Sequence, residues 1–174
     1  IAKYVMMPGN AKKRHPVVEA RTAALVEFAE TTDLNRIEAG RDNRMGIITS
    51  STSYQYVKEV LGDKYPVMKL GMIWPMPVEK IKTFAASVEK LVIVEELESF
   101  IESHCRDLGL ACVGKEKFSL IGELMPLDVA KELAEVWETG AKLEEAIPPR
   151  PPVMCAGCPH RGLFYTLKKN KLTV

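Results

Sequence analysis

The stretch Leu91-Val92-Ile93-Val94-Glu95-Glu96 decides the fold of this chain. Its apolar residues follow one another without polar alternation, which is typical of a parallel strand covered on both faces. Two carboxylates come next, at the end of the strand where ligand sites of α/β proteins often lie. Adjacent side chains of a strand point to opposite faces, so Glu95 and Glu96 make a poor acid/base pair. We expect a structural role instead, such as holding a neighbouring loop or another domain.

Short apolar runs and helical patterns alternate on both sides of this stretch. Apolar runs predict further strands at residues 45–50, 65–70 and 110–113, and residues 118–121 fit either a fifth strand or a buried loop. Apolar side chains at helical spacing predict helices at residues 16–31, 52–61, 77–88, 99–108 and 126–136. The polar segment 35–43 is expected to be a loop or a frayed end. This alternation predicts an α/β fold with a mostly parallel sheet and helices on both faces.

Hydroxyl-bearing residues stand where two of these helices are expected to begin. Thr52 with Gln55, and Ser99 with Glu102, have the spacing of capping boxes. The hydroxyl cluster at residues 49–53 also suggests a phosphate site, because helix N-termini attract anions. No glycine-rich loop accompanies it, so capping is the preferred interpretation. His104 has no evident partner and is expected to be a surface or rim residue.

Composition limits the classes of partner. The chain has 174 residues and 47% hydrophobic content, enough for one domain with a core. Its net charge of +1 provides no global field that would favour nucleic acid or an anionic membrane. No apolar run approaches the roughly 20 residues that span a bilayer. Four cysteines, two of them in a metal-type pair, favour a reducing compartment, so we expect a cytoplasmic protein.

The residues with the clearest chemical character lie near the end, in Met154-Cys155-Ala156-Gly157-Cys158-Pro159-His160-Arg161-Gly162, after a proline-rich run at 148–152. Two cysteines at this spacing can place both sulfurs on one metal or cluster. A tetrahedral site needs four ligands, and Cys105 and Cys112 do not obviously supply the others. The spelling does not fit haem attachment, a thioredoxin-type pair or a zinc finger. Spacing alone leaves metal or cofactor contact and a structural turn open.

The order of motifs resembles a known family. The segment CAGCPHRG, after its proline-rich run, resembles the opening of the thiamine-diphosphate domain in the alpha subunit of indolepyruvate ferredoxin oxidoreductases, which are 2-oxoacid:ferredoxin oxidoreductases. Residues 4–11 and 14–16 resemble that subunit's exit from its pyrimidine-binding domain. Three segments between them are similar to its middle domain: 46–50, 54–58 and 92–96.

The resemblance implies a domain plan for an internal fragment of the subunit. Residues 1–15 would be a linker from the pyrimidine-binding domain, and residues 16–140 a domain like the C-terminal domain of transketolase, which binds no thiamine. Residues 141–152 would be a proline-rich linker, and residues 153–174 the truncated start of the thiamine-diphosphate domain. Both chain ends are therefore expected to be cut ends.

The resemblance also implies a function for the parent enzyme. It would oxidatively decarboxylate arylpyruvates to aryl-acyl-CoA and pass electrons to ferredoxin, using thiamine diphosphate, Mg²⁺ and 4Fe–4S clusters. None of these cofactors is expected on this chain alone. The implied partners are the beta subunit, ferredoxin, arylpyruvate and coenzyme A, with neither nucleic acid nor membrane among them.

The site residues follow from the same resemblance. Cys155, Gly157, Cys158, His160 and Arg161 are candidates for cofactor contact, and Cys155 and Cys158 for metal ligation. No catalytic residue is expected in the chain. Two alternatives stay open: a domain of a cluster-free thiamine enzyme of the transketolase type, and a small α/β binding module.

Overall fold

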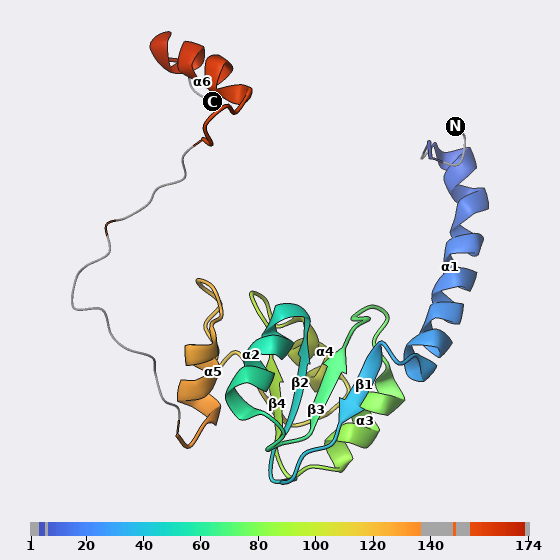
Figure 1. Cartoon of the computed structure of the whole chain (residues 1–174). Helices are drawn as coiled ribbons and strands as arrows, with labels where there is room; N and C mark the ends of the chain where they lie inside the picture. Colours follow the sequence, from blue (N-terminus) through green and yellow to red (C-terminus); the bar gives the residue numbers. More distant parts are fainter. Residues whose placement is uncertain (1–3, 6, 137–147, 149–153, 173–174) are drawn as a thin grey trace. The chain divides into compact units, whose positions relative to one another are not determined.

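The strand at residues 91–94 lies inside a five-stranded sheet with the order β1-β3-β2-β4-β5 (Figure 1). This strand, β4 (Leu91–Val94), pairs in parallel with β2 (Gly46–Ser50) and β5 (Cys112–Val113). On the other side of β2, β3 (Val67–Leu70) is also parallel. Only the edge strand β1 (Asn35–Glu38) runs antiparallel, against β3. The prediction of a mostly parallel sheet is therefore confirmed.

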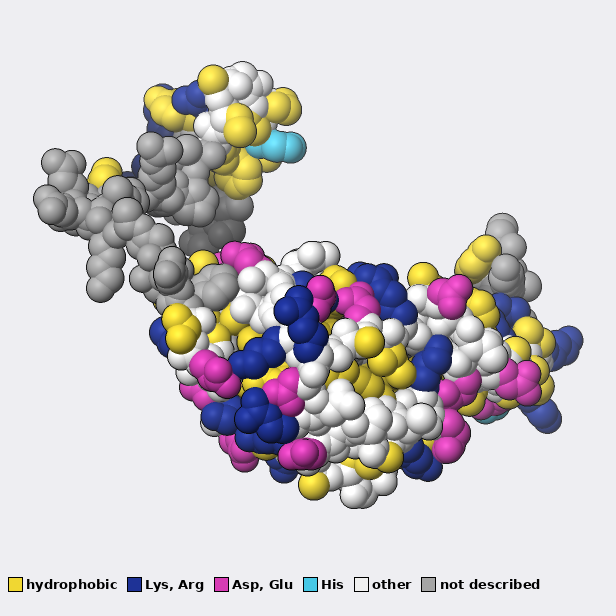
Figure 2. All heavy atoms as spheres, turned by 60° about the horizontal axis from the view of Figure 1, so that its bottom comes forward, with side chains coloured by type: hydrophobic (Ala, Val, Ile, Leu, Met, Phe, Trp, Pro, Cys, Tyr) yellow, Lys and Arg dark blue, Asp and Glu magenta, His cyan; other side chains and the backbone are white. Residues whose placement is uncertain are grey.

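The structure is a computed structural model that describes residues 4–5, 7–136, 148 and 154–172. The chain divides into two compact units, residues 1–139 and residues 140–174. In the described part, no helix combines the length and apolar character that crossing a membrane requires. Figure 2 shows Lys and Arg side chains interspersed with Asp and Glu on the face drawn, in keeping with the small net charge.

Helices cover both faces of the sheet. The described helices are α1 (Pro8–Thr31), α2 (Ser51–Leu61), α3 (Val78–Ala86), α4 (Phe100–Asp107), α5 (Pro126–Leu133) and, in the second unit, α6 (His160–Lys169). The core has two halves: α2 and α5 pack on one face, and α3 and α4 on the other. Successive strand residues alternate between the halves, so Val92 packs with Val57 of α2, and Ile93 with Ile81 of α3. β4 is buried along its whole length, as its sequence predicts.

Helix α1 begins earlier than predicted. It starts at Pro8 and has Pro16 inside it, whereas the sequence suggested a start at Pro16, because proline favours a first turn. The run 12–15, expected in a linker, is helical. Ala29 is its only buried residue, so most of its apolar side chains do not pack on the core.

The end of α1 is attached to the sheet unit by remote polar contacts. The Glu30 carboxylate accepts hydrogen bonds from the backbone N–H groups of Glu79 (2.9 Å) and Lys80 (3.0 Å), in the first turn of α3. In return, Lys80 Nζ donates to the carbonyls of Thr32 (3.2 Å) and Asn35 (2.8 Å) just beyond α1. These contacts stabilise two helix termini at once.

Two further segments differ in how well the sequence predicted them. The polar segment 35–43 was expected to be a loop, but its beginning forms β1, because an edge strand needs only one buried side. Asn35 is 1% exposed there and joins the Ala29 carbonyl to the backbone N–H of Met72. Residues 118–121 were predicted to form either a fifth strand or a buried loop. They form a loop, in which Phe118 is buried and Ile121 is exposed.

Neither predicted capping box forms. Helix α2 begins at Ser51, and the residue before it, Ser50, makes no side-chain capping bond. Ser51 has φ 49°, a left-handed backbone conformation at the strand-to-helix turn. The described contacts therefore do not support capping as the explanation of the hydroxyl cluster. At α4, the Ser99 hydroxyl contacts Ser103 instead of a backbone N–H.

Candidate functional site

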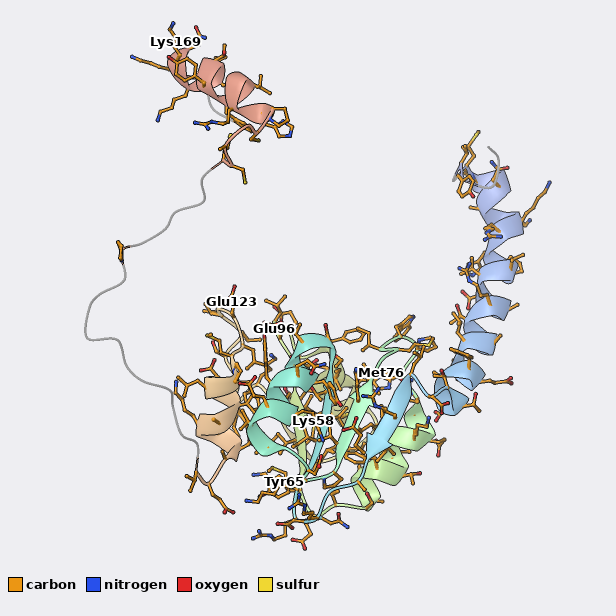
Figure 3. The ribbon with its side chains drawn as sticks, in the orientation of Figure 1. Lys58, Tyr65, Met76, Glu96, Glu123 and Lys169 are labelled. Carbon is orange, nitrogen blue, oxygen red and sulfur yellow. The ribbon has the colours of Figure 1, made fainter. Side chains whose placement is uncertain are left out.

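The carboxyl ends of the parallel strands meet at one edge of the sheet, where Glu96 and Glu123 lie (Figure 3). Loops after β2, β3, β4 and β5 gather at this edge, as in ligand-binding α/β proteins. This edge is therefore the candidate site of the first unit, and acidic side chains lie along it.

Glu95 caps helix α4 from outside the helix. The side chain is 6% exposed, and its two carboxylate oxygens accept hydrogen bonds from the backbone N–H groups of Ile101 (2.7 Å) and Glu102 (3.0 Å). These groups belong to the first turn, whose N–H groups have no partner within the helix. Burial raises the pKa of Glu95, although both backbone hydrogen bonds act in the opposite direction. The expected structural role is confirmed.

Glu102 is also buried and fully engaged. One carboxylate oxygen accepts a hydrogen bond from the Arg106 guanidinium (2.6 Å), and the other from the backbone N–H of Lys115 (2.8 Å). Lys115 Nζ in turn donates to the carbonyl of Glu95 at 2.5 Å. A side chain at Gly114 would meet the Glu102 carboxylate, so glycine is needed for this close approach.

Glu96 points to a different neighbour, as expected for consecutive strand residues. One of its carboxylate oxygens accepts a hydrogen bond from the backbone N–H of Leu124 at 3.2 Å. It thereby holds the loop between β5 and α5. The two adjacent carboxylates bind different segments, so they do not form an acid/base pair.

The cysteine pair of the second unit lies in a turn that opens α6. Cys155 is exposed and Cys158 half-buried, and the Cys158 N–H donates to the Cys155 carbonyl at 3.1 Å. Gly157 has φ 77°, which a glycine adopts without strain. His160 and Arg161 occupy the first turn of α6 and are exposed. All five candidate residues thus lie in one turn and the helix start that follows it.

A complete metal site is not found in the residues that the structure describes, where no group of three or more His, Cys, Asp or Glu side chains could hold an ion. Cys105 and Cys112 belong to the sheet unit. Burial raises the pKa of Cys105 to about 12, so its thiol stays protonated and is a poor ligand. The two thiols of the turn could provide only part of a site.

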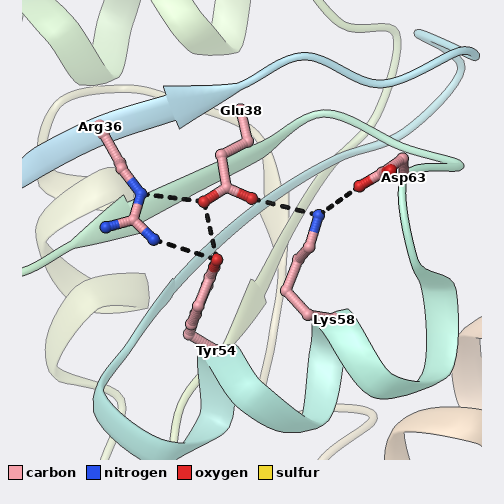
Figure 4. A network of polar contacts seen from close by, with 5 residues as sticks. All are labelled: Arg36, Glu38, Tyr54, Lys58 and Asp63. Carbon is pink, nitrogen blue, oxygen red and sulfur yellow. Dashed lines mark hydrogen bonds and ion pairs between the residues drawn. The ribbon is translucent and has the colours of Figure 1, made fainter.

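Sequence reasoning missed a polar network between β1 and α2 (Figure 4). Glu38 is at its centre and accepts hydrogen bonds from the Tyr54 hydroxyl (2.7 Å) and Arg36 Nε (2.9 Å). Lys58 Nζ lies 3.1 Å from Glu38 and 2.7 Å from Asp63. Burial acts to raise the pKa of Glu38, but the three donors outweigh it and lower the pKa to about 2.

This network fixes the edge strand to α2. Its members are far apart in sequence, and β1 itself was not predicted. The sequence signal for Tyr54 was its helical spacing within residues 52–61, which puts it on one face with Val57 and Leu61. In the structure this face packs in the core, and Tyr54 is 8% exposed.

Comparison with known proteins gives a consistent result. Over 188 residues, the chain is 31% identical to the indolepyruvate oxidoreductase subunit IorA of Archaeoglobus fulgidus, covering 95% of this chain. The subunit IorA of Thermococcus kodakarensis is 31% identical over 96% of the chain, and that of Pyrococcus horikoshii 30% over 96%. The chain spans only 29% of the length of these relatives. No protein-family model matches it.

One solved structure supports the fold. A 2-oxoglutarate:ferredoxin oxidoreductase from Magnetococcus marinus matches 75% of this chain and 24% of its own, with a TM-score of 0.56 and 19% identity. The solved protein carries 2-oxoglutarate, coenzyme A and succinyl-CoA. At this low sequence identity, the match supports a similar fold and nothing further. It agrees with an α/β domain like the C-terminal domain of transketolase.

Proposed function

Because this chain belongs to the same family as one segment of the indolepyruvate oxidoreductase subunit IorA, we propose that it is the non-catalytic middle domain of such an enzyme. The observation that carries the proposal is the sequence match along 95% of the chain. The structural contacts of Glu95, Glu96 and Glu102 support it, since these three carboxylates of the described residues each bind a different segment rather than form an acid/base pair.

The parent enzyme would convert an arylpyruvate, coenzyme A and oxidised ferredoxin to an aryl-acyl-CoA, carbon dioxide and reduced ferredoxin. Thiamine diphosphate with Mg²⁺ would supply the carbon chemistry and 4Fe–4S clusters the electron path. The described residues contain no group of three or more His, Cys, Asp or Glu side chains that could hold a metal ion. We assign these cofactors to other parts of the parent. The proposed partners of the parent are a beta subunit and ferredoxin, and its proposed location is the cytoplasm.

Within this chain, residues 16–140 would form the middle domain and residues 153–174 the start of the thiamine-diphosphate domain. Residues 1–15 and 141–152 would be the connections. The structure divides into two units between Thr139 and Gly140, which supports the proposed end of the middle domain at residue 140. The Cys155–Arg161 turn would face the cofactor region of the parent, with Cys155, Gly157, Cys158, His160 and Arg161 as contact residues and the two thiols as candidate ligands.

A chimera tests the proposal. In the chimera, this chain replaces the matched segment of the Archaeoglobus fulgidus IorA subunit. The chimeric subunit is then produced together with the partner subunit of that enzyme. We expect indolepyruvate-dependent reduction of a viologen dye to be retained, because the domain would supply shape and contacts rather than chemistry. A second chimera with Ile93→Asp is the control and should lose activity through unfolding. A chimera that assembles with normal thiamine and iron content but shows no turnover would contradict the proposal.

A further inference from the structure

A cavity of about 390 Å³ opens between helix α4 and the loop that follows β3. One wall is a stripe of α4, in which Phe100, Ser103, His104 and Asp107 are spaced to lie on a single face. The opposite face of α4 carries Ile101 and Cys105 and packs on the sheet. The remaining lining residues are Trp74, Glu98 and Ser99. The stripe therefore uses the side of α4 that the core leaves free.

The lining combines aromatic surface with uncompensated negative charge. Trp74 is 64% exposed and Phe100 is 48% exposed, which is unusual for large aromatic side chains in a folded domain. Among the described residues, the carboxylates of Glu98 and Asp107 have no ion-pair partner, and no Lys or Arg lines the cavity. His104 Nε2 is enclosed and has no hydrogen-bond partner there. The charge and the aromatic faces favour a cation.

Helix geometry strengthens this preference. Asp107 is the last residue of α4, where the unpaired carbonyls of the helix carry partial negative charge. A cation near that end of the cavity would meet the Asp107 carboxylate and the negative end of the helix. Glu98 lies before the other end of α4 and would attract a cation there. An anionic ligand would be repelled by both carboxylates.

Two residues next to the lining residues in sequence indicate what kind of molecule brings the cation. Ile73 and Leu97, the neighbours of Trp74 and Glu98 in the chain, are 43% and 66% exposed. Leu97 has φ 56°, a left-handed conformation that is costly for a branched side chain in a loop. Exposed apolar side chains this close in sequence to the lining are suited to contact apolar side chains of a protein partner.

We propose that this cavity binds the guanidinium group of an arginine presented by a protein partner. A planar guanidinium can stack on the Trp74 or Phe100 ring while its fork of N–H groups reaches a carboxylate, which a lysine ammonium cannot do equally well. The exposed Ile73 and Leu97 side chains would contact the residues beside that arginine. This inference goes beyond the proposed function and does not depend on it.

The fluorescence of Trp74 provides a direct test. The chain has two tryptophans, so the full 174-residue chain with Trp137→Phe reports from Trp74 alone. The probe is the peptide acetyl-Leu-Arg-Leu-amide, and its control replaces arginine by citrulline, which has the same shape without the charge. We expect a saturable change in emission with the arginine peptide, and binding of the citrulline peptide weaker by about tenfold or more.

Variants identify the groups responsible. Glu98→Gln and Asp107→Asn should each weaken binding of the arginine peptide several-fold, whereas Glu59→Gln, an exposed acid on α2, should not. Unchanged thermal unfolding would establish that each variant is folded. Equal binding of the citrulline peptide, or unchanged binding in both cavity variants, would overturn the proposal. Free arginine binding as tightly as the peptide would overturn the assignment to a protein partner.

Discussion

Glu38 illustrates how the surroundings of a single residue control its charge. Its three donors hold the pKa at about 2, below the ordinary value of 4.5. The folded state therefore binds the proton less readily than the unfolded state. The resulting stabilisation is present above about pH 4.5 and is lost as the pH falls towards 2.

The corresponding prediction concerns Glu38→Gln. At pH 7 we expect a loss of about 1–3 kcal/mol in the free energy of unfolding, because a neutral amide lacks the attraction to Arg36 and Lys58. The difference from the wild type should narrow between pH 4.5 and pH 2. Urea unfolding at several pH values measures this. A pH-independent difference would show that the charge of Glu38 is not responsible.

A second residue-scale prediction uses two isoleucines with different environments. Ile93 in β4 is 1% exposed, and Ile37 in the edge strand β1 is 46% exposed. Replacing Ile93 by Ala should cost about 2–5 kcal/mol, because it removes packed methyl groups and leaves a cavity. Ile37→Ala should cost about 1 kcal/mol or less, since most of that side chain already meets water. Similar losses in urea unfolding would contradict the observed burial of β4.

At the scale of elements, helix ends are stabilised by carboxylates from elsewhere in the chain. The Glu30 carboxylate binds the first turn of α3, and the Glu95 carboxylate binds the first turn of α4. For α4 the sequence suggested a local capping box of Ser99 and Glu102 instead. A carboxylate near a helix N-terminus also interacts favourably with the helix dipole. These contacts connect neighbouring elements, so each cap also contributes to tertiary structure.

The prediction at this scale is for Glu95→Gln. The amide offers one acceptor instead of two and turns an N–H donor towards the helix end, so we expect a loss of about 1–2 kcal/mol in the free energy of unfolding. Because burial raises the pKa of Glu95, its titration favours the folded state below the ordinary pKa, and this contribution is lost as the pH rises through the folded pKa.

The advantage of the wild type over Glu95→Gln should therefore decrease as the pH rises from about 4 to 7. Denaturation at these pH values checks the sign. An advantage that grows with pH would mean that the pKa of Glu95 is lowered rather than raised.

For the whole molecule, the prediction concerns activity. The described residues contain no complete metal site, and their buried acids are engaged in structural contacts. We expect the purified chain, given thiamine diphosphate, Mg²⁺ and coenzyme A, not to reduce a viologen dye with indolepyruvate. The chimeric subunit is the positive control. Turnover by the chain alone would contradict its assignment as a non-catalytic domain.

Local patterns in the sequence were enough to predict the class of fold. The unbroken apolar run Leu91–Val94 indicated a strand buried on both faces, and the spacing of Tyr54, Val57 and Leu61 indicated the packed face of α2. Both predictions are confirmed. They were possible from the sequence because the periodicities of strands and helices extend over only a few neighbouring residues. The order of motifs also indicated the family.

Only the tertiary structure decided which distant groups meet. It showed that β1 is a strand, that α1 extends back to Pro8, and that Glu95 rather than Ser99 caps α4. It also joined the Trp74 loop to one face of α4 in a single cavity. These features depend on contacts between segments far apart in the chain. No local periodicity encodes them, because the free energy of such contacts arises only when the sheet brings the segments together.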